Sequence, residues 1–214
     1  TFYDTENDVW TGYVMSGQVT SLYTLSIPNY QLVVNMAGEL VETSVDNGDG
    51  TFTYDVPVRQ GYEWSDGNPI TANDWQFTFD TVKGLSLGGN FLQAYPYSCE
   101  DEEGNSKNCV VSVVATDDYT VSITFNYDPG LSTWQYGTAQ GPAFSKAYWE
   151  QYATDKETLY AVDAIDAPVA SAFVYDRLET GAFYTWAYDP NTMWDGGTTT
   201  IYDGGGTSVA WDNG

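Results

Sequence analysis

The first regular pattern of apolar positions predicts a β-hairpin over residues 46–58. Its turn reads Asp-Asn-Gly-Asp-Gly, a composition typical of tight turns, and Phe52, Tyr54 and Val56 then share one face of a strand. The acidic turn also resembles a calcium-binding loop, but Gly48 lies where the spacing of an EF-hand needs an oxygen ligand. We therefore interpret this turn as structural and expect no metal site in it.

A second alternating pattern predicts another hairpin, with its turn in the polar run 116–118. The apolar residues of its two strands are Val111, Val113, Val121, Ile123 and Phe125. Beyond a connector at 163–168, the aromatic residues of 173–188 recur at the spacing of strands. Turn-forming residues then fill 189–197, and the glycine-rich tail around 204–206 has few core residues. The chain is therefore expected to be rich in antiparallel hairpins.

Two helix starts interrupt this strand pattern. The first begins at Thr71, where a hydroxyl and the Asp74 carboxylate are placed to cap the first turn, and it is expected to end at Gly84. Its apolar face consists of Trp75, Phe79 and Val82. A shorter helix is predicted from Ser145, whose hydroxyl is placed to cap it. Its inward-facing residues are Tyr148, Trp149 and Tyr152.

Composition narrows the classes of partner. Thirty acidic residues against six basic ones give a formal charge of −24, so the protein repels nucleic acid and anionic lipid surfaces. Because self-repulsion of this size is relieved by concentrated salt, we predict a halophilic source. An acidic surface adapted to ordinary salt is the alternative. With 42% hydrophobic residues, the chain of 214 residues has enough apolar side chains for a core.

Histidine and cysteine usage limits the chemistry further. The chain has no histidine, which excludes Ser-His-Asp and Cys-His catalytic sites and His-ligated zinc. Cys99 and Cys109 bracket a polar run typical of an exposed loop, so we predict a local disulfide and an oxidising compartment. Two free thiols are the alternative.

Targeting signals are not evident in the sequence. No apolar run approaches the ~20 residues that span a bilayer, and the first residues lack the charged and apolar regions of a signal peptide. If the protein is exported, we expect any leader to have been removed already.

One segment carries a resemblance to a known family. Residues 59–74 read Arg-Gln-Gly-Tyr-Glu-Trp-Ser-Asp-Gly-Asn-Pro-Ile-Thr-Ala-Asn-Asp. This order of an Arg-x-Gly turn, a Trp-Ser-Asp-Gly-x-Pro loop and a Thr-Ala-x-Asp helix start resembles the signature of family 5 extracellular solute-binding proteins, which serve ABC importers of oligopeptides, dipeptides and nickel. We interpret its residues as scaffold, because none of these groups performs chemistry. They are Gly61, Trp64, Asp66, Gly67, Pro69, Thr71 and Asp74.

Three further stretches are similar to the family in the same order. They are 46–54, 115–125 and 189–197, the last with Met193 where the family usually has Tyr. The resemblance implies a type II periplasmic-binding-protein-like α/β (α+β) lobe, a mixed β-sheet with flanking helices, and a second lobe that is absent here. We accordingly interpret 1–214 as one lobe-like region, with a hairpin-rich subdomain at 38–140 and a segment at 165–214 that returns to the main sheet.

The resemblance also implies a function and a site. It implies extracellular binding of a peptide or similar small solute for an ABC permease and its ATPase, with no cofactor, no catalysis and a membrane anchor in the full-length protein. Tyr95 lies in a stretch similar to one whose tyrosine faces the ligand cleft, and a packed tyrosine is the alternative. Weaker candidates, chosen on composition alone, are Trp134, Tyr136, Tyr23 and Tyr30.

Two functions from other classes remain open. A structural cell-surface or filament-forming subunit would use exposed strand edges for self-assembly. A glycosidase would use paired carboxylates, which need no histidine, with tryptophan and tyrosine against sugar rings.

Overall fold

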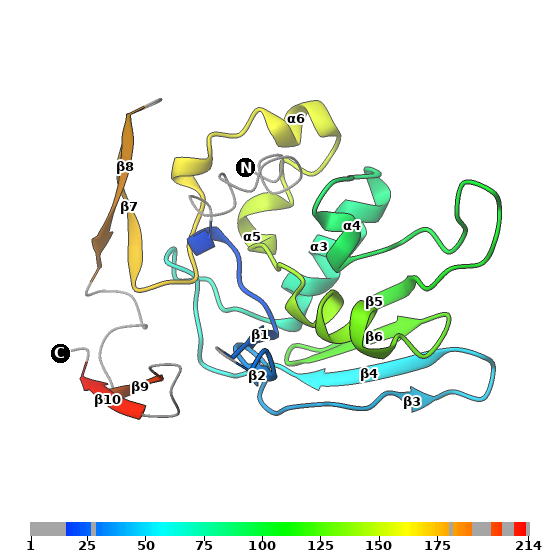
Figure 1. Ribbon diagram of the computed structural model, residues 1–214. Coiled ribbons are helices and arrows are strands. Elements are labelled where there is room, and N and C mark those ends of the chain that lie inside the picture. Colours follow the sequence, from blue (N-terminus) through cyan, green and yellow to red (C-terminus); the bar gives the residue numbers. More distant parts are fainter. Residues whose placement is uncertain (1–15, 27–28, 180–181, 190–197, 203–207, 213–214) are drawn as a thin grey trace.

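The computed structural model describes residues 16–26, 29–179, 182–189, 198–202 and 208–212 (Figure 1). Its main sheet has four antiparallel strands. Their order is β3 (Val45–Asp46), β4 (Phe52–Pro57), β6 (Thr120–Phe125) and β5 (Val110–Asp117). β3 and β4 form the first predicted hairpin and β5 and β6 the second, so both predictions are confirmed.

The register of the sheet separates an apolar face from a polar one. Tyr54 pairs with Ile123 and Val56 with Val121, and all four side chains are buried. Residues between them point the other way, where the Ser122 hydroxyl donates a 2.6 Å hydrogen bond to the Asp55 carboxylate. This alternation follows from the two-residue period of a strand, and it leaves one face for the helices to cover.

Helix α3 (Ala72–Gly84) packs on β5 and β6. It begins after Thr71 and ends at Gly84, as the sequence predicts. The backbone N–H of Thr71 donates a 2.8 Å hydrogen bond to the Asp74 carboxylate, which caps the first turn. The predicted apolar face is buried in full: Trp75, Phe79 and Val82. The helix is thus placed by its capping residue and by one apolar stripe.

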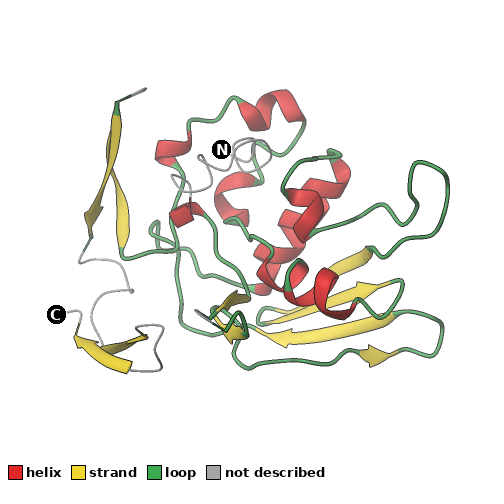
Figure 2. Ribbon diagram, in the orientation of Figure 1, coloured by secondary structure: helices red, strands yellow, loops and turns green. Residues whose placement is uncertain are grey.

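The remaining helical segments are short. They are η1 (Ser16–Gln18), α4 (Phe91–Ala94), the π-helical turn η2 (Leu131–Gln135), η3 (Thr138–Gln140), α5 (Lys146–Trp149), α6 (Lys156–Tyr160) and η4 (Ala164–Asp166) (Figure 2). α5 follows Ser145 as predicted, but the Ser145 hydroxyl makes no capping bond and has no hydrogen-bond partner among the described residues. Trp149 is buried, whereas Tyr148 and Tyr152 are half-buried. The predicted cap is therefore wrong.

The other strands form two-stranded antiparallel sheets. These pair β1 (Tyr23–Leu25) with β2 (Leu32–Val34), β7 (Phe173–Glu179) with β8 (Phe183–Tyr188), and β9 (Thr198–Tyr202) with β10 (Ser208–Asp212). Residues 173–188 are strands, as predicted. The described strands after residue 165 pair with one another, so they do not return to the main sheet, and Figure 1 draws them apart from it. The turns at 190–197 and the tail at 204–206 lie outside the described residues.

All described strand pairs are antiparallel. A mixed β-sheet, as expected from the sequence, would contain at least one parallel pair, and none occurs among the described strands. For the pairs β3–β4 and β5–β6, the physical reason lies in the connections. β3 and β4, like β5 and β6, are joined by short turns, and a tight turn reverses the chain, whereas a parallel pair needs a long crossover.

Cys99 and Cys109 form the predicted disulfide. It closes a loop in which residues 102–107 are exposed, and Cys109 itself is buried. The alternative of two free thiols is excluded. The crosslink therefore ties an otherwise exposed loop to the start of β5.

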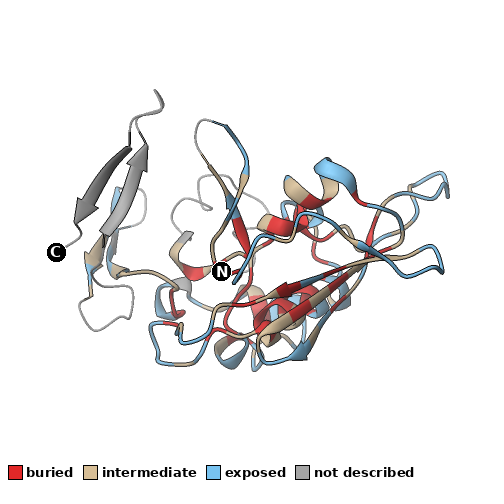
Figure 3. Ribbon diagram, turned by 90° about the horizontal axis from the view of Figure 1, so that it is seen from below, coloured by how far each residue is buried: buried red, intermediate tan, exposed pale blue. Residues whose placement is uncertain are grey.

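The core lies where the helical segments cover the apolar face of the main sheet (Figure 3). Its largest side chains are Trp64, Trp75, Trp149, Tyr23, Tyr95, Phe79, Phe91, Phe125 and Phe144. Aromatic burial of this extent accounts for the tryptophans and tyrosines that recur along the sequence. The longest described helix, α3, has 13 residues, so no helix in the described part of the chain meets the requirements of length and hydrophobicity for crossing a membrane.

Candidate functional site

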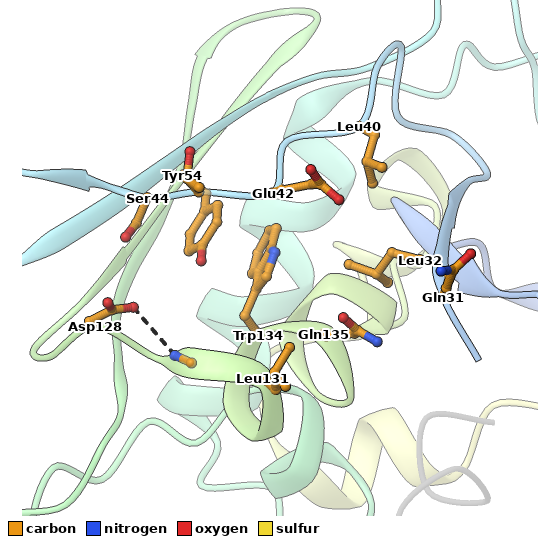
Figure 4. A pocket seen from close by; sticks show the side chains of 12 residues that line it. Gln31, Leu32, Leu40, Glu42, Ser44, Tyr54, Asp128, Leu131, Trp134 and Gln135 are labelled. Atoms are coloured by element: carbon orange, nitrogen blue, oxygen red, sulfur yellow. Dashed lines mark hydrogen bonds between the residues drawn. The ribbon is translucent and has the colours of Figure 1, made fainter. Parts of the chain in front are cut away.

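A cavity of about 630 Å³ opens beside the end of the main sheet (Figure 4). Four stretches line it: the start of β2, the loop before β3, the middle of β4 and the segment from the end of β6 into η2. The lining residues are Gln31, Leu32, Leu40, Glu42, Thr43, Ser44, Tyr54, Asp128, Gly130, Leu131, Trp134 and Gln135. This mixture of apolar, aromatic and polar side chains is typical of small-molecule pockets.

Two stacked rings form the inner wall of this pocket. The rings of Tyr54 and Trp134 lie 3.8 Å apart between centroids and 11° from parallel. Both side chains are almost fully buried, with 4% and 3% of their surfaces exposed. Tyr23 and Phe125 meet Trp134 edge to face, with centroids 6.0 and 6.3 Å away. The wall is thus held rigid from behind, which lowers the entropy cost of binding a solute against it.

The Tyr54 hydroxyl lies between two polar groups. Burial raises the pKa of Tyr54, the hydrogen bond with the Ser44 side chain lowers it in part, and the negative charge of Asp128 raises it further. The tyrosine therefore stays neutral at physiological pH. In that form it offers an O–H to the pocket rather than a negative charge.

The mouth of the pocket carries exposed apolar side chains. Leu131, at the start of η2, is 68% exposed, and Leu40 on the opposite loop is 42% exposed. The side-chain amide of Gln135 donates a 3.0 Å hydrogen bond to the carbonyl of Tyr30, which joins η2 to the chain before β2. Leucines held in water at a pocket entrance gain most by covering a bound solute.

Tyr23 holds the loop that forms one side of the pocket. Its hydroxyl donates to the Glu39 carbonyl at 3.0 Å and accepts from the Val41 N–H at 3.1 Å. Burial raises the pKa of Tyr23 to about 12. The ring contacts Trp134, so one buried tyrosine fixes the loop that contains Leu40 relative to the aromatic wall.

The signature segment 59–74 contributes no residue to this pocket. Gly61 and Gly67 have φ of +81° and +82°, a conformation that glycine adopts without strain. The Asp66 carboxylate accepts a bond from the Asn68 backbone N–H at 3.1 Å, and the N–H of Gly67 donates to the Trp64 carbonyl at 2.9 Å. These are the bonds of a tight loop that leads into α3, so the geometry supports a scaffold role.

The acidic turn at 46–50 also forms bonds within itself. The Asp46 carboxylate accepts from the Gly48 N–H at 2.8 Å, and that of Asp49 accepts from the Thr51 N–H at 3.0 Å. The bond from the Thr51 hydroxyl, together with that from the Thr51 N–H, lowers the pKa of Asp49. Across the described ranges, no group of three or more acidic or cysteine side chains is placed to hold a metal ion.

The sequence of the chain matches one known protein family. The family model described as bacterial extracellular solute-binding proteins, family 5 Middle, matches residues 35–201, which are most of the chain. The chain belongs to this family. The match includes the signature segment and every lining residue of the pocket except Gln31 and Leu32, which precede it.

Relatives of the family 5 chain are longer proteins. A Deinococcus radiodurans protein described as "Probable ABC transporter-binding protein" is 28% identical over 92 residues, which are 42% of this chain and 14% of that protein. The periplasmic binding protein DppA of Helicobacter pylori, solved with the peptide STSA, matches with a TM-score of 0.61 at 14% identity over 89% of this chain and 37% of that one. OppA of Listeria monocytogenes, bound to peptide, matches with a TM-score of 0.56 at 17% identity over 90% of this chain and 37% of that one.

At these identities the solved structures show a shared fold. The expected fold class, a lobe of the periplasmic-binding-protein type with helices and sheet, is confirmed. The family 5 chain spans little more than a third of the length of these solved proteins.

The structure separates the five residues predicted for ligand binding. Trp134 lines the pocket. Tyr136 and Tyr30 are 53% and 59% exposed and lie next to lining residues in the sequence, but they do not line the pocket themselves. Tyr23 is buried behind the wall. Their direct contact with a solute stays a prediction.

Tyr95 is placed in the core. It has no exposed surface, its hydroxyl donates to the Pro142 carbonyl at 2.9 Å, and its ring meets Phe79 edge to face. Burial raises the pKa of its hydroxyl well above the ordinary value. This geometry favours the packed-tyrosine alternative, so we leave Tyr95 out of the proposed site.

Sequence reasoning missed most of the pocket. The lining residues that it did not nominate as ligand contacts include Leu40, Glu42, Asp128, Leu131 and Gln135. The strand pattern places Tyr54 on the core face of a strand. In the structure its side chain is buried and also lines the pocket. Among these residues, the sequence pointed only to Leu131 as an exposed apolar residue. Leu131 follows the Pro-Gly turn at 129–130 and does not belong to the apolar face of a predicted strand or helix.

Proposed function

We propose that this chain supplies one wall of a solute-binding cleft in an extracellular family 5 protein. The solute is a peptide or a similar small molecule, and the full-length protein delivers it to an ABC permease with its ATPase. No covalent chemistry is part of this function. The observation that carries the proposal is the rigid Tyr54–Trp134 wall in a 630 Å³ pocket of a family 5 chain.

The character of the pocket supports binding. Its inner wall is preorganised by packing, while its mouth offers exposed leucines and its lining includes polar side chains. This combination of a fixed apolar surface with a few polar groups gives affinity without demanding one side chain on the ligand. The disulfide fits an oxidising location such as the cell surface. Membrane anchoring and a halophilic source stay predictions.

The filament-forming alternative receives less support. β5 is an edge strand of the main sheet, where unpaired backbone groups would permit self-assembly. Two side chains of α3 occupy this edge: the Gln76 amide oxygen accepts from the Ala115 N–H at 2.9 Å, and the Lys83 ammonium donates to the Val111 carbonyl at 3.2 Å. An edge covered in this way is a poor template for another strand.

Two exposed leucines provide a matched test of the pocket. Leu131 lines the pocket, whereas Leu92 on α4 is 43% exposed and does not line it. Binding of a mixed tri- to pentapeptide library to the full-length protein would be measured by calorimetry. We expect Leu131→Ala to weaken peptide binding by roughly tenfold, because it removes apolar surface that covers the solute. Leu92→Ala is expected to leave it within about twofold.

Several results would count against the proposal. Peptides that fail to bind the unaltered protein, or equal weakening by both leucine variants, would remove the pocket from consideration. Sedimentation of the purified protein as a polymer would favour the filament-forming subunit instead. Hydrolysis of glycans by the purified protein would favour the glycosidase.

A further inference from the structure

The charged residues that line the pocket are all acidic. They are Glu42 and Asp128, whereas none of the six basic residues of the chain lines it. A pocket that accepted a solute carboxylate would place a lysine, arginine or group of N–H donors against it. The negative charge of the lining residues therefore indicates which chemical group of a solute the pocket accepts.

The two carboxylates lie on opposite sides of the aromatic wall in Figure 4, with Tyr54 and Trp134 between them. Both keep capacity to accept hydrogen bonds. Asp128 accepts one long bond, 3.4 Å, from the Gly130 N–H. Within the described residues, Glu42 has no hydrogen bond or ion pair. Carboxylates that are not already bonded to the protein are free to accept bonds from a solute.

The position of Asp128 beside the pocket also suits a cation. Asp128 is close enough to Tyr54 to raise the pKa of its hydroxyl, so the charge of Asp128 reaches into the pocket rather than only into water. The carboxylates of Glu42 and Asp128 are both exposed, so their attraction for a cation is partly screened by water. The sign of the charges and their place in the cavity thus indicate one chemical class of solute group, a cation.

We infer that this pocket selects a positively charged group of the solute, an ammonium or guanidinium, held between Glu42 and Asp128 against the Tyr54–Trp134 wall. The inference rests on the proposed function and names the substrate class of the same site. For a peptide, the group is an amino terminus or the side chain of lysine or arginine. A peptide whose acidic group faces this wall is rejected by repulsion.

An acidic protein attracts cations everywhere, so the test needs a control for its overall field. The chain offers such a control in a second cavity, which is lined by Asp163 and Asp166. This cavity shares no lining residue with the first pocket, and its residues follow those of the first pocket in the sequence. The variants Glu42→Gln/Asp128→Asn and Asp163→Asn/Asp166→Asn change the net charge by the same amount. Only the first pair alters the proposed site.

The probes are the tripeptides Ala-Lys-Ala, Ala-Gln-Ala and Ala-Glu-Ala, each with a free and an acetylated amino terminus. Their affinities for the full-length protein would be measured by calorimetry at fixed ionic strength. We expect a cationic group, at the side chain or the amino terminus, to bind about tenfold more tightly than its neutral counterpart, as two partly screened ion pairs predict. The Glu42/Asp128 variant should lose this preference and still bind Ala-Gln-Ala.

Each outcome is informative. Loss of the preference in the Glu42/Asp128 variant alone supports the inference. Equal loss in both double variants assigns the preference to the overall field and overturns it. Tight binding of all probes without a charge preference overturns the inference but leaves the proposed function intact. Binding of none of them, by a protein that also fails to bind the peptide library, overturns both.

Discussion

The carboxylate of Asp74 accepts a 2.8 Å hydrogen bond from the backbone N–H of Lys146, 72 positions further along the chain. The same carboxylate accepts from the N–H of Thr71 at 2.8 Å and from the indole N–H of Trp64 at 3.4 Å. One side chain, 3% exposed, thereby joins the signature loop, the start of α3 and the start of α5. The capping residue predicted from sequence is also a tertiary junction.

Removing this junction should destabilise the fold. Asp74→Ala leaves the N–H groups of Thr71 and Lys146 without their acceptor, and we expect the free energy of unfolding at pH 7 to fall by about 1–2 kcal/mol. Asp80→Ala is the matched control, since Asp80 is an exposed residue of the same helix, and it should change stability by less than about 0.5 kcal/mol. Urea denaturation measures both. Equal effects of the two substitutions would contradict the role of Asp74.

The cost of Asp74→Ala should depend on pH. Burial raises the pKa of Asp74 from 3.8 to about 6, against the lowering effect of its hydrogen bonds. A carboxyl whose pKa is raised by folding binds its proton more tightly in the folded state, so its contribution to stability is full below pH 3.8 and is lost as the pH rises through 6. The difference between wild type and variant should therefore widen from pH 7 to pH 4, by at most about 3 kcal/mol. A difference that is constant or narrows would contradict this assignment.

Local sequence signals were sufficient for the elements around this junction. The hairpin turn at 46–50, the cap at Thr71 and the apolar stripe of α3 each depend on residues within one turn or one strand of each other. The disulfide was predictable for the same reason, because its cysteines are separated by only 10 positions. Such signals do not require knowledge of which segments meet in space.

The pocket could not be predicted in this way. Its walls come from four separate stretches, and whether a tyrosine faces a cleft or the core depends on packing from distant residues. Tyr95 shows this, because its hydroxyl partner is the carbonyl of Pro142, 47 positions away. Tyr54 and Trp134 became neighbours only when η2 packed on the main sheet. The composition indicated that aromatic residues would line the site, but tertiary contacts determine which tyrosine or tryptophan does so.

The two glycines of the signature region and helix end should respond differently to alanine. Gly67 has φ of +82° with open space around it, so Gly67→Ala is expected to cost about 1–2 kcal/mol through backbone strain alone. Gly84, the last residue of α3, has an ordinary φ and equally open space, so Gly84→Ala should be neutral or stabilise by up to about 1 kcal/mol. Chemical denaturation of the two variants measures the contrast. A similar change in both would show that the turn does not depend on the left-handed conformation.

The disulfide should stabilise the chain through its unfolded state. Replacing both Cys99 and Cys109 with alanine removes the closure of a loop of about 10 residues, and we expect a loss of about 2–3 kcal/mol in the free energy of unfolding. Reducing agent should lower the denaturation midpoint of the wild type to a similar extent and leave that of the variant unchanged. A wild type whose midpoint does not respond to reduction would show that the crosslink contributes nothing to equilibrium stability.

The large negative charge predicts a response to salt. A net charge of −24 repels itself in the compact state more than in the expanded one, and the distance over which charges act falls from about 10 Å at 0.1 M salt to about 3 Å at 1 M. The thermal midpoint should therefore rise steeply from 0.1 to 1 M KCl. Because screening is then nearly complete, the rise should level off at higher concentrations, whereas an effect on apolar surface would continue. The variant Asp163→Asn/Asp166→Asn, with less negative charge, should show a smaller rise. A midpoint that is flat or falls between 0.1 and 1 M KCl would remove the physical basis for a halophilic source.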